Sequence, residues 1–225
     1  MKNEIKCKKP LSCYDYLLMF DLASKNTGVS LWDLKEKRPI EVFQITANDN
    51  EVTHVYELYE KIDKLLYYIC VKYSTDFSKI LISKEAMPVQ LRTRASTVQT
   101  FVALARSHAT LDLFAEIHWI AVYDYVGIYP VSWQAYFKRI NGLDSKHLVS
   151  KEEVQKYLVD KYGLEFKTLD ESDATFLGET LLNSKWNKDI DEEIRAIKRE
   201  KKELKAPHAI ALRDQRIEFL EKIKI

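Results

Sequence analysis

Four acidic residues stand where chemistry is often placed, at the ends of apolar segments and at the start of a helix. Asp21 follows the apolar run YLLMF, and Glu85 follows the apolar run ILIS and one lysine. Asp170 and Asp173 open the segment DESDATFL, where a spacing of three puts both on one face of a helix. Carboxylate oxygens are hard ligands that suit Mg²⁺. The set therefore indicates a metal site that hydrolyses phosphodiesters with two ions.

Each of these acids also has an ordinary structural interpretation. An aspartate at a strand end before a turn is common, and a glutamate at a strand terminus is usually only solvated. Asp170 has the position of a helix N-cap, and acids in a first turn suit the helix dipole. The metal-site hypothesis therefore depends on the elements that would bring the four acids together.

Hydrophobic patterning predicts an alternation of strands and helices. Short apolar or alternating runs predict strands, and apolar residues at helical spacing predict helices. The expected strands are 16–22, 28–34, 40–46, 79–83 and 125–131, and the expected helices are 52–73, 95–120, 132–140, 151–162 and 170–182. Three antiparallel strands followed by helix-linked strands are typical of the α/β class and of the RNase H-like α/β/α sandwich with a mixed five-stranded sheet. In such a sheet the fourth strand lies beside the first.

The C-terminal part of the chain has a different composition. From Asn187 onwards charges alternate in sign and apolar residues are sparse, and Pro207 divides the segment into two expected helices. This pattern fits a solvated helical hairpin or an appendage that contacts a partner or DNA. We therefore predict a nuclease domain over residues 15–183 and a charged helical extension over 184–225.

Overall composition limits the function classes. A chain of 225 residues can form one good-sized α/β domain with an appendage. A net charge of +1 argues against bulk coating of nucleic acid, but it allows a basic surface beside an acidic site. We expect no membrane span and no signal peptide. The three cysteines fit no zinc spacing, so reduced thiols and a cytoplasmic location are expected.

The ordered acids and their flanking residues resemble the RuvC-type Holliday junction resolvases, in particular a divergent phage or viral member. The family has a small-residue turn with Ser or Thr and Gly after the first acid, as in LASKNTG over 22–28. Its second acid follows an apolar strand, and its last two lie in a DxxDA motif that opens a helix. The resemblance covers residues 15–183. It departs from the family at Leu22 and Ala23, where glycines are often found, and in the extra tail.

The resemblance implies a homodimeric endonuclease that nicks opposing strands of four-way and other branched DNA. Asp21, Glu85, Asp170 and Asp173 would be the catalytic residues and the metal ligands. They would hold two Mg²⁺ ions per active site, with Mn²⁺ as a substitute. The helix over 95–120 would form the dimer interface. The expected location is a bacterial host cytoplasm or a viral replication site.

Basic residues near the acids are candidates for holding DNA phosphates. Arg92 and Arg94 follow Glu85 in the loop before the long helix, and Lys84 directly precedes Glu85. Lys138 and Arg139 come later, before the DxxDA motif, in the region where the family binds junction DNA. Each of these cations is otherwise a solvated surface charge.

Aromatic residues raise a related choice. Tyr123, Tyr125 and Trp133 could stack on unpaired bases, or they could pack in the core. Phe101 and Trp119 suit the packed face of the long helix.

Three other interpretations compete with a resolvase. The chain could be another RNase H-like nuclease, such as a ribonuclease H or a transposase-like enzyme, but the DxxDA helix start favours the resolvase. It could be a non-catalytic RNase H-like nucleic-acid-binding module, which would be expected to lose at least one acid. An actin-like ATPase would need a glycine-rich adenosine loop, and the whole chain has five glycines.

Overall fold

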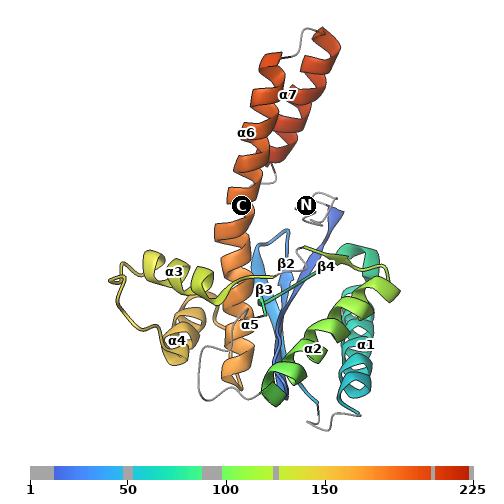
Figure 1. Ribbon diagram of the computed structural model, residues 1–225, viewed down its shortest axis with the longest axis vertical. Coiled ribbons are helices and arrows are strands. Elements are labelled where there is room, and N and C mark those ends of the chain that lie inside the picture. Colours follow the sequence, from blue (N-terminus) through green and yellow to red (C-terminus); the bar gives the residue numbers. More distant parts are fainter. Residues whose placement is uncertain (1–12, 48–52, 88–97, 124–126, 204–205, 223–225) are drawn as a thin grey trace.

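Five strands form one mixed sheet with helices on both faces (Figure 1). The computed structural model describes residues 13–47, 53–87, 98–123, 127–203 and 206–222. The strands are β1 (Tyr16–Asp21), β2 (Asn26–Asp33), β3 (Arg38–Thr46), β4 (Ile80–Lys84) and β5 (Ala121–Val122). They follow the order β3-β2-β1-β4-β5, with β1 to β3 antiparallel and with β4 parallel to β1 and β5. The expected place of the fourth strand beside the first is confirmed.

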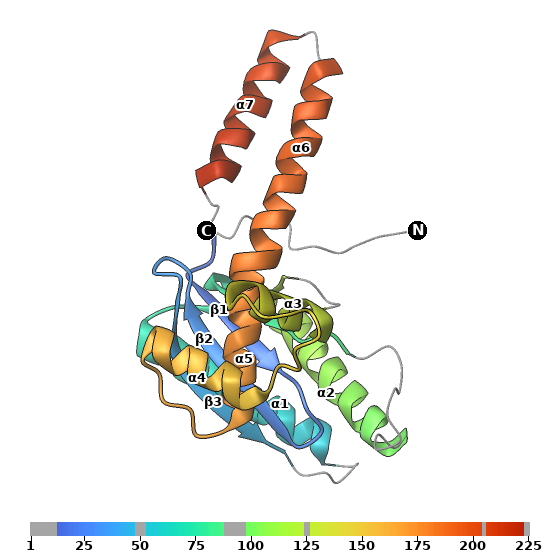
Figure 2. The same cartoon turned by 90° about the vertical axis from the view of Figure 1, so that its left-hand side faces the viewer.

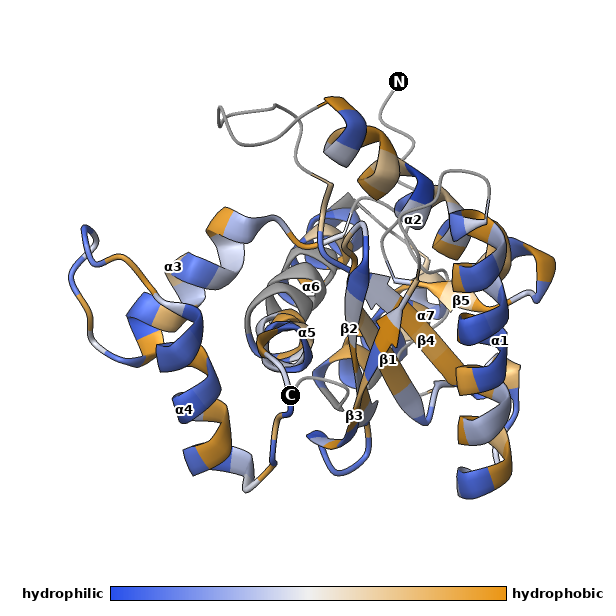
Figure 3. Cartoon of the chain, turned by 90° about the horizontal axis from the view of Figure 1, so that it is seen from below, coloured by the Kyte–Doolittle hydropathy of each residue, from blue (hydrophilic) through white to orange (hydrophobic). Residues whose placement is uncertain are grey.

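The helices cover the sheet in layers (Figures 2 and 3). They are α1 (His54–Tyr73), α2 (Val98–Ile117), α3 (Pro130–Ile140), α4 (Lys151–Tyr162) and α5 (Leu169–Thr180), with a 3₁₀ turn, η2, at Phe77–Lys79. Helices α1 and α2 lie on one face of the sheet, and α5 lies on the other. Helices α3 and α4 pack on the outer side of α5 through an aromatic and aliphatic cluster, and we call them the outer lobe.

The pleat of the two central strands decides which side chains face α5. Side chains alternate between the two faces of a strand. Leu18 and Phe20 accordingly pack towards α1 and α2, whereas Leu17 and Met19 pack towards α5. Asp21 follows Leu17 and Met19 in this alternation, so its side chain also faces α5. The same alternation along β4 puts Leu81 and, further on, Glu85 on the α5 side.

Close backbone contact joins α5 to the sheet. A Cβ at Gly28 of β2 would overlap the backbone carbonyl of Asp170, so the start of α5 rests directly on this glycine. Further along, Ser30 Oγ donates a hydrogen bond to the carbonyl of Ala174 at 3.0 Å. Gly178 plays a similar part on the helix, where a Cβ would overlap the indole of the fully buried Trp32. The first turn of α5 is therefore fixed in height above the sheet.

The predicted fifth strand is wrong in position. The strand pairs at Ala121–Val122 with Leu81 and Ile82 of β4, whereas the prediction was 125–131. The reason is the end of α2: Trp119 adopts a left-handed backbone with φ of 55°, and the chain turns towards the sheet earlier than expected. Residues 124–126 lie outside the described part of the chain. Ile128 makes only an isolated bridge, with Glu85.

The C-terminal helices form a hairpin that projects from the far end of α5 (Figure 1). After a π-helical segment, η3 (Leu181–Trp186), the chain continues as α6 (Asn187–Glu203) and α7 (Pro207–Lys222). The expected separation of two helices at Pro207 is confirmed. Ile194, Ile197 and Leu220 are buried and belong to the apolar cluster on the α5 side of the sheet, which also contains Leu17 and Met19. Arg213 forms an ion pair with Glu200 across the hairpin. The proposed domain boundary after residue 183 stays a prediction.

Among the helices of the described residues, none has the length and apolar character that a membrane crossing requires.

The contact between Gly28 and α5 gives a first testable prediction. Gly28→Ala should lower the free energy of unfolding by about 1–3 kcal/mol, because the added methyl group pushes the first turn of α5 off the sheet. Urea denaturation measures this change. Gly142→Asn is the control, since a Cβ there meets no atom within 4 Å and Asn tolerates its left-handed backbone. An unchanged stability of Gly28→Ala would show that this contact does not fix α5.

Candidate metal centre

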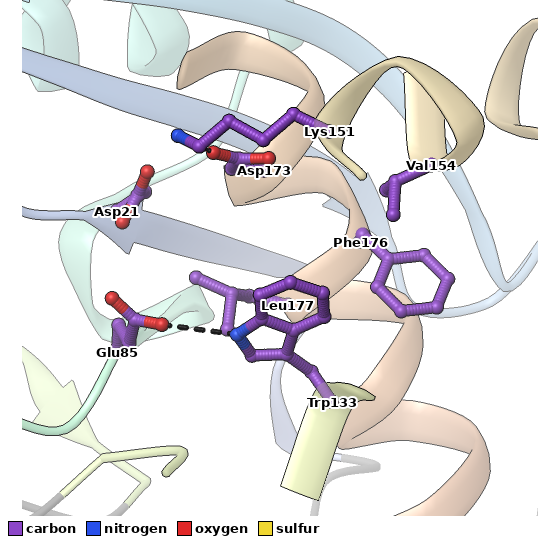
Figure 4. A pocket seen from close by; sticks show the side chains of 8 residues that line it. All are labelled: Asp21, Glu85, Trp133, Lys151, Val154, Asp173, Phe176 and Leu177. Carbon is purple, nitrogen blue, oxygen red and sulfur yellow. Dashed lines mark hydrogen bonds and ion pairs between the residues drawn. The ribbon is translucent and has the colours of Figure 1, made fainter. Parts of the chain in front are cut away.

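The structure gathers the four predicted acids at one end of the sheet. Asp21, Asp170 and Asp173 each offer a carboxylate oxygen, and these oxygens lie within 4.8 Å of one another. Glu85 is outside that tight group, but it lines the same cavity of 150 Å³ as Asp21 and Asp173 (Figure 4). Three elements far apart in sequence thus supply one carboxylate cluster.

Parallel pairing of β1 and β4 places Asp21 beside Glu85. The register pairs Phe20 with Lys84, and the backbone amide of Glu85 donates to the carbonyl of Phe20 at 3.0 Å. Both acids therefore leave their strands at the same height. Because the alternation of side chains puts both acids on the α5 side of the sheet, they project towards the helix that carries the other two acids.

The interpretation of Asp170 as the N-cap of its helix is wrong. Thr168 caps α5, and it forms a capping box in which Glu171 binds back to the cap. Asp170 is therefore not needed to cap the helix. Its carboxylate instead accepts a hydrogen bond from Gln44 Nε2 of β3 at 3.2 Å, with Asp173 one turn further along.

Burial and mutual repulsion make the cluster electrostatically unfavourable on its own. Burial raises the pKa of Asp21 well above its usual range, and the nearby charges of Glu85 and Asp173 raise it further. Burial also raises the pKa of Glu85 and of Asp173. Like charges that are held together favour a bound cation or a shared proton. All the donors are hard carboxylate oxygens, so the residues fit a divalent cation such as Mg²⁺.

Lys151 is a residue of this site that the sequence did not reveal. It opens α4, its ammonium group is ion-paired with Asp173, and it lines the cavity. Burial lowers the pKa of Lys151, but the hydrogen bond to Asp173 and the nearby carboxylates outweigh that effect and raise it. The capping-box sequence of α4 marks a helix start, although it does not say what the first turn faces.

Trp133 is the second residue whose role at this site the sequence did not reveal. It packs against the apolar clusters around α5, as one of the two interpretations held, but it is only half-buried, and its indole nitrogen donates to Glu85 Oε1 at 3.1 Å (Figure 4). Tyr123, by contrast, is buried in the core on the α5 side of the sheet. Tyr125 lies outside the described residues.

The predicted DNA-binding residues are only partly described. Arg92 and Arg94 lie outside the described residues. On α3, Lys138 Nζ donates to the carbonyl of Ser145 at 2.7 Å, and Arg139 lies 5.4 Å from the centre of the Tyr136 ring. Neither Lys138 nor Arg139 lines the cavity of the acid cluster.

Lys84 does not belong to a DNA-facing surface. Because side chains alternate along β4, that of Lys84 points to the face covered by α2, where it is buried and ion-paired with Asp112. The idea that it helps to hold phosphates is therefore wrong.

The sheet order, the helical layers and the position of the acid cluster define an RNase H-like fold, and its particular form is that of RuvC. T. thermophilus RuvC in complex with a Holliday junction substrate superposes with a TM-score of 0.51 at 13% identity, covering 74% of this chain and 92% of the RuvC chain. Another Thermus thermophilus RuvC structure gives 0.51 at 12% identity, covering 73% and 92%. No family model and no curated protein matches the sequence. The structural likeness establishes the fold.

The raised pKa of Asp21 predicts how stability depends on pH when no metal is bound. An acid whose folded pKa lies above its unfolded value, about 4, favours the folded state at low pH and loses that contribution as pH rises through the folded pKa. Asp21→Asn removes the repulsion. In EDTA near neutral pH it should therefore raise the free energy of unfolding by about 1 kcal/mol.

Thermal unfolding in EDTA between about pH 4 and pH 8 measures this effect, because the advantage of Asp21→Asn should shrink towards the acid end. Asp160→Asn is the matched control, since Asp160 is exposed on α4. Lower stability of Asp21→Asn than of the wild type at neutral pH would contradict the assignment of repulsion to this cluster.

Proposed function

We propose that this protein is a Mg²⁺-dependent, structure-selective endonuclease that cleaves four-way (Holliday) junctions and other branched DNA. The observation that carries the proposal is the convergence of Asp21, Glu85, Asp170 and Asp173 at one end of an RNase H-like sheet. The choice of junctions as substrate is supported by the fold shared with a RuvC that was solved with a Holliday junction substrate.

In this proposal the four carboxylates would hold the metal, which when bound would supply activation of water and stabilisation of the leaving oxygen. The chain contributes rigidity, because two acids end neighbouring strands and two lie in a capped helix. Lys151 places a positive charge at the edge of the cavity. When phosphate enters, the ammonium group can contact a phosphate oxygen and lower the repulsion between DNA and the acids.

DNA would be held by basic residues separate from the acid cluster. Arg92 and Arg94 follow Glu85 along the chain, and Lys138 and Arg139 end α3 in the outer lobe. These cations would bind phosphates of the junction arms and leave the cut itself to the carboxylates.

Cleavage of defined substrates tests the proposal. Purified protein is incubated with synthetic four-way junction, fork and duplex DNA, with Mg²⁺ and with EDTA. Mg²⁺-dependent nicks in branched DNA are expected. Asp21→Asn and Asp173→Asn should each lower the cleavage rate by about a thousandfold, which corresponds to about 4 kcal/mol of transition-state stabilisation. Asp160→Asn, on the exposed face of α4, should cleave like the wild type.

Two other outcomes would replace the proposal. Metal-dependent cutting of the RNA strand in an RNA–DNA hybrid, with junctions left intact, would indicate a ribonuclease H. Tight junction binding without any cleavage in Mg²⁺ or Mn²⁺ would indicate a non-catalytic binding module.

We also propose that the protein acts as a homodimer through α2. Apart from its ends, α2 buries one face against the sheet and α1, and it leaves an apolar stripe on the opposite face. Trp119 follows the helix end and is 91% exposed, as a residue of the predicted dimer face would be in a single subunit. The members of the stripe on the helix are Val98, Val102, Ala105, Ala109, Leu113 and Ile117.

The stripe is self-complementary. Antiparallel pairing of two copies about the middle of α2 would match the two ends of the stripe with each other. It would also bring the alanines together at the crossing, where small side chains let two helices approach closely. A two-fold dimer needs such a self-complementary surface. The pairs are Val98 with Ile117, Val102 with Leu113 and Ala105 with Ala109.

A charge in the stripe should separate the subunits. We expect wild-type protein to sediment as a dimer at micromolar concentration and Leu113→Glu to sediment as a monomer, because each dimer would bury two unpaired carboxylates. Tyr67→Glu is the control, since Tyr67 is a 68% exposed apolar residue on α1 outside the stripe. A strictly monomeric wild type, with junction DNA present, would overturn the dimer.

A further inference from the structure

Trp133 contacts the acid cluster through a donor that is neutral and cannot bind a metal. It lies in the first turn of α3, and its indole Nε1 donates a hydrogen bond of 3.1 Å to Glu85 Oε1 (Figure 4). The indole nitrogen only donates, carries no charge and cannot ligate a cation. It therefore engages one oxygen of the carboxylate without competing for a metal and without adding a charge that would repel one.

The direction of this hydrogen bond is set by packing in the outer lobe. The Trp133 ring meets Phe176 edge to face, with 6.2 Å between centroids and 83° between planes. Phe176 is almost fully buried on α5, one turn after Asp173, and it also contacts the rings of Tyr136 and Phe137. The indole is thus held by the same helix that supplies two of the other acids.

Glu85 gains from such support because its side chain is long. Its backbone is fixed by the hydrogen bond to Phe20 and by the bridge to Ile128, but a glutamate side chain still has three rotatable bonds. Asp173 repels its carboxylate when no cation is present, whereas Asp21 and Trp133 both engage it by hydrogen bonds. The indole of Trp133 is the neutral donor that fixes one of its two oxygens.

We propose that Trp133 is a positioning residue that holds Glu85 in place for a divalent cation, an inference that rests on the metal site of the proposed function. Trp133 engages Oε1 and leaves Oε2 to face the cavity side of the cluster. Metal ligands are commonly oriented by hydrogen bonds from their neighbours, and loss of such a partner costs about 10–100-fold in metal affinity or activity. The outer lobe therefore contributes to the metal site through Trp133 as well as through Lys151.

Calorimetric titration of the DNA-free protein with Mn²⁺ tests this inference directly. Trp133→Phe keeps an aromatic ring against Phe176, and replacement of Trp133 by benzothienylalanine keeps the shape and exchanges only the N–H for sulfur. Both changes should weaken Mn²⁺ binding by about tenfold or more. Tyr56→Phe is the control, because it removes a hydrogen-bond donor to a carboxylate, Glu60, on the exposed face of α1, and it should leave Mn²⁺ affinity unchanged.

The cleavage assay adds a second readout. The Mn²⁺ concentration for half-maximal cleavage should rise in both Trp133 variants, and activity should recover largely at saturating Mn²⁺. Wild-type Mn²⁺ affinity in the benzothienylalanine protein would overturn the inference and leave the nuclease proposal standing. If the wild type binds Mn²⁺ but cleaves no branched DNA, the nuclease proposal fails, and calorimetry still decides the role of Trp133. A wild type that binds no Mn²⁺ overturns both.

Discussion

The parallel pairing of β1 with β4 is the constraint on which the candidate site depends. It puts Asp21 and Glu85 at the same height, and the pleat turns both towards α5. A slip of one residue in either strand would move that strand's acid to the opposite face, where Lys84 is buried against α2. Both strands are buried on both faces, as is usual for paired parallel strands covered by helices on each side.

The outer lobe is held to this frame by a buried charge on α5. The fully buried Glu179 accepts hydrogen bonds from Tyr136, Tyr157 and Lys161 at 3.2, 2.6 and 2.7 Å, so one carboxylate links α3, α4 and α5. A buried carboxylate needs such partners, and removing one would leave a costly unpaired group. The lobe in turn presents Lys151 and Trp133 to the acid cluster. The C-terminal hairpin leaves the opposite end of α5, away from the acid cluster (Figure 1).

Much of the fold could be predicted from the sequence because periodicity reports which faces are buried. The three-stranded meander, the amphipathic α1 and the capped α4 all follow from local patterns. β5 could not be placed, since its two residues carry no period and its position depends on a left-handed turn at Trp119. The acids could be proposed because strand ends and a helix start are visible in sequence. Lys151 and Trp133 could not, because their roles arise from packing of the outer lobe on α5.

The acid cluster connects the stability of the protein with its proposed chemistry. Three separate elements bring carboxylates together, and burial raises the pKa of several of them, so the metal-free fold bears their repulsion. A cation that binds only the folded chain stabilises it by an amount that grows with its concentration relative to the dissociation constant. Metal binding would therefore tighten β1, β4 and the start of α5 against one another. The rigid surroundings, with Gly28 under α5 and Thr168 capping it, keep the acids from relaxing apart and so preserve the site for the cation.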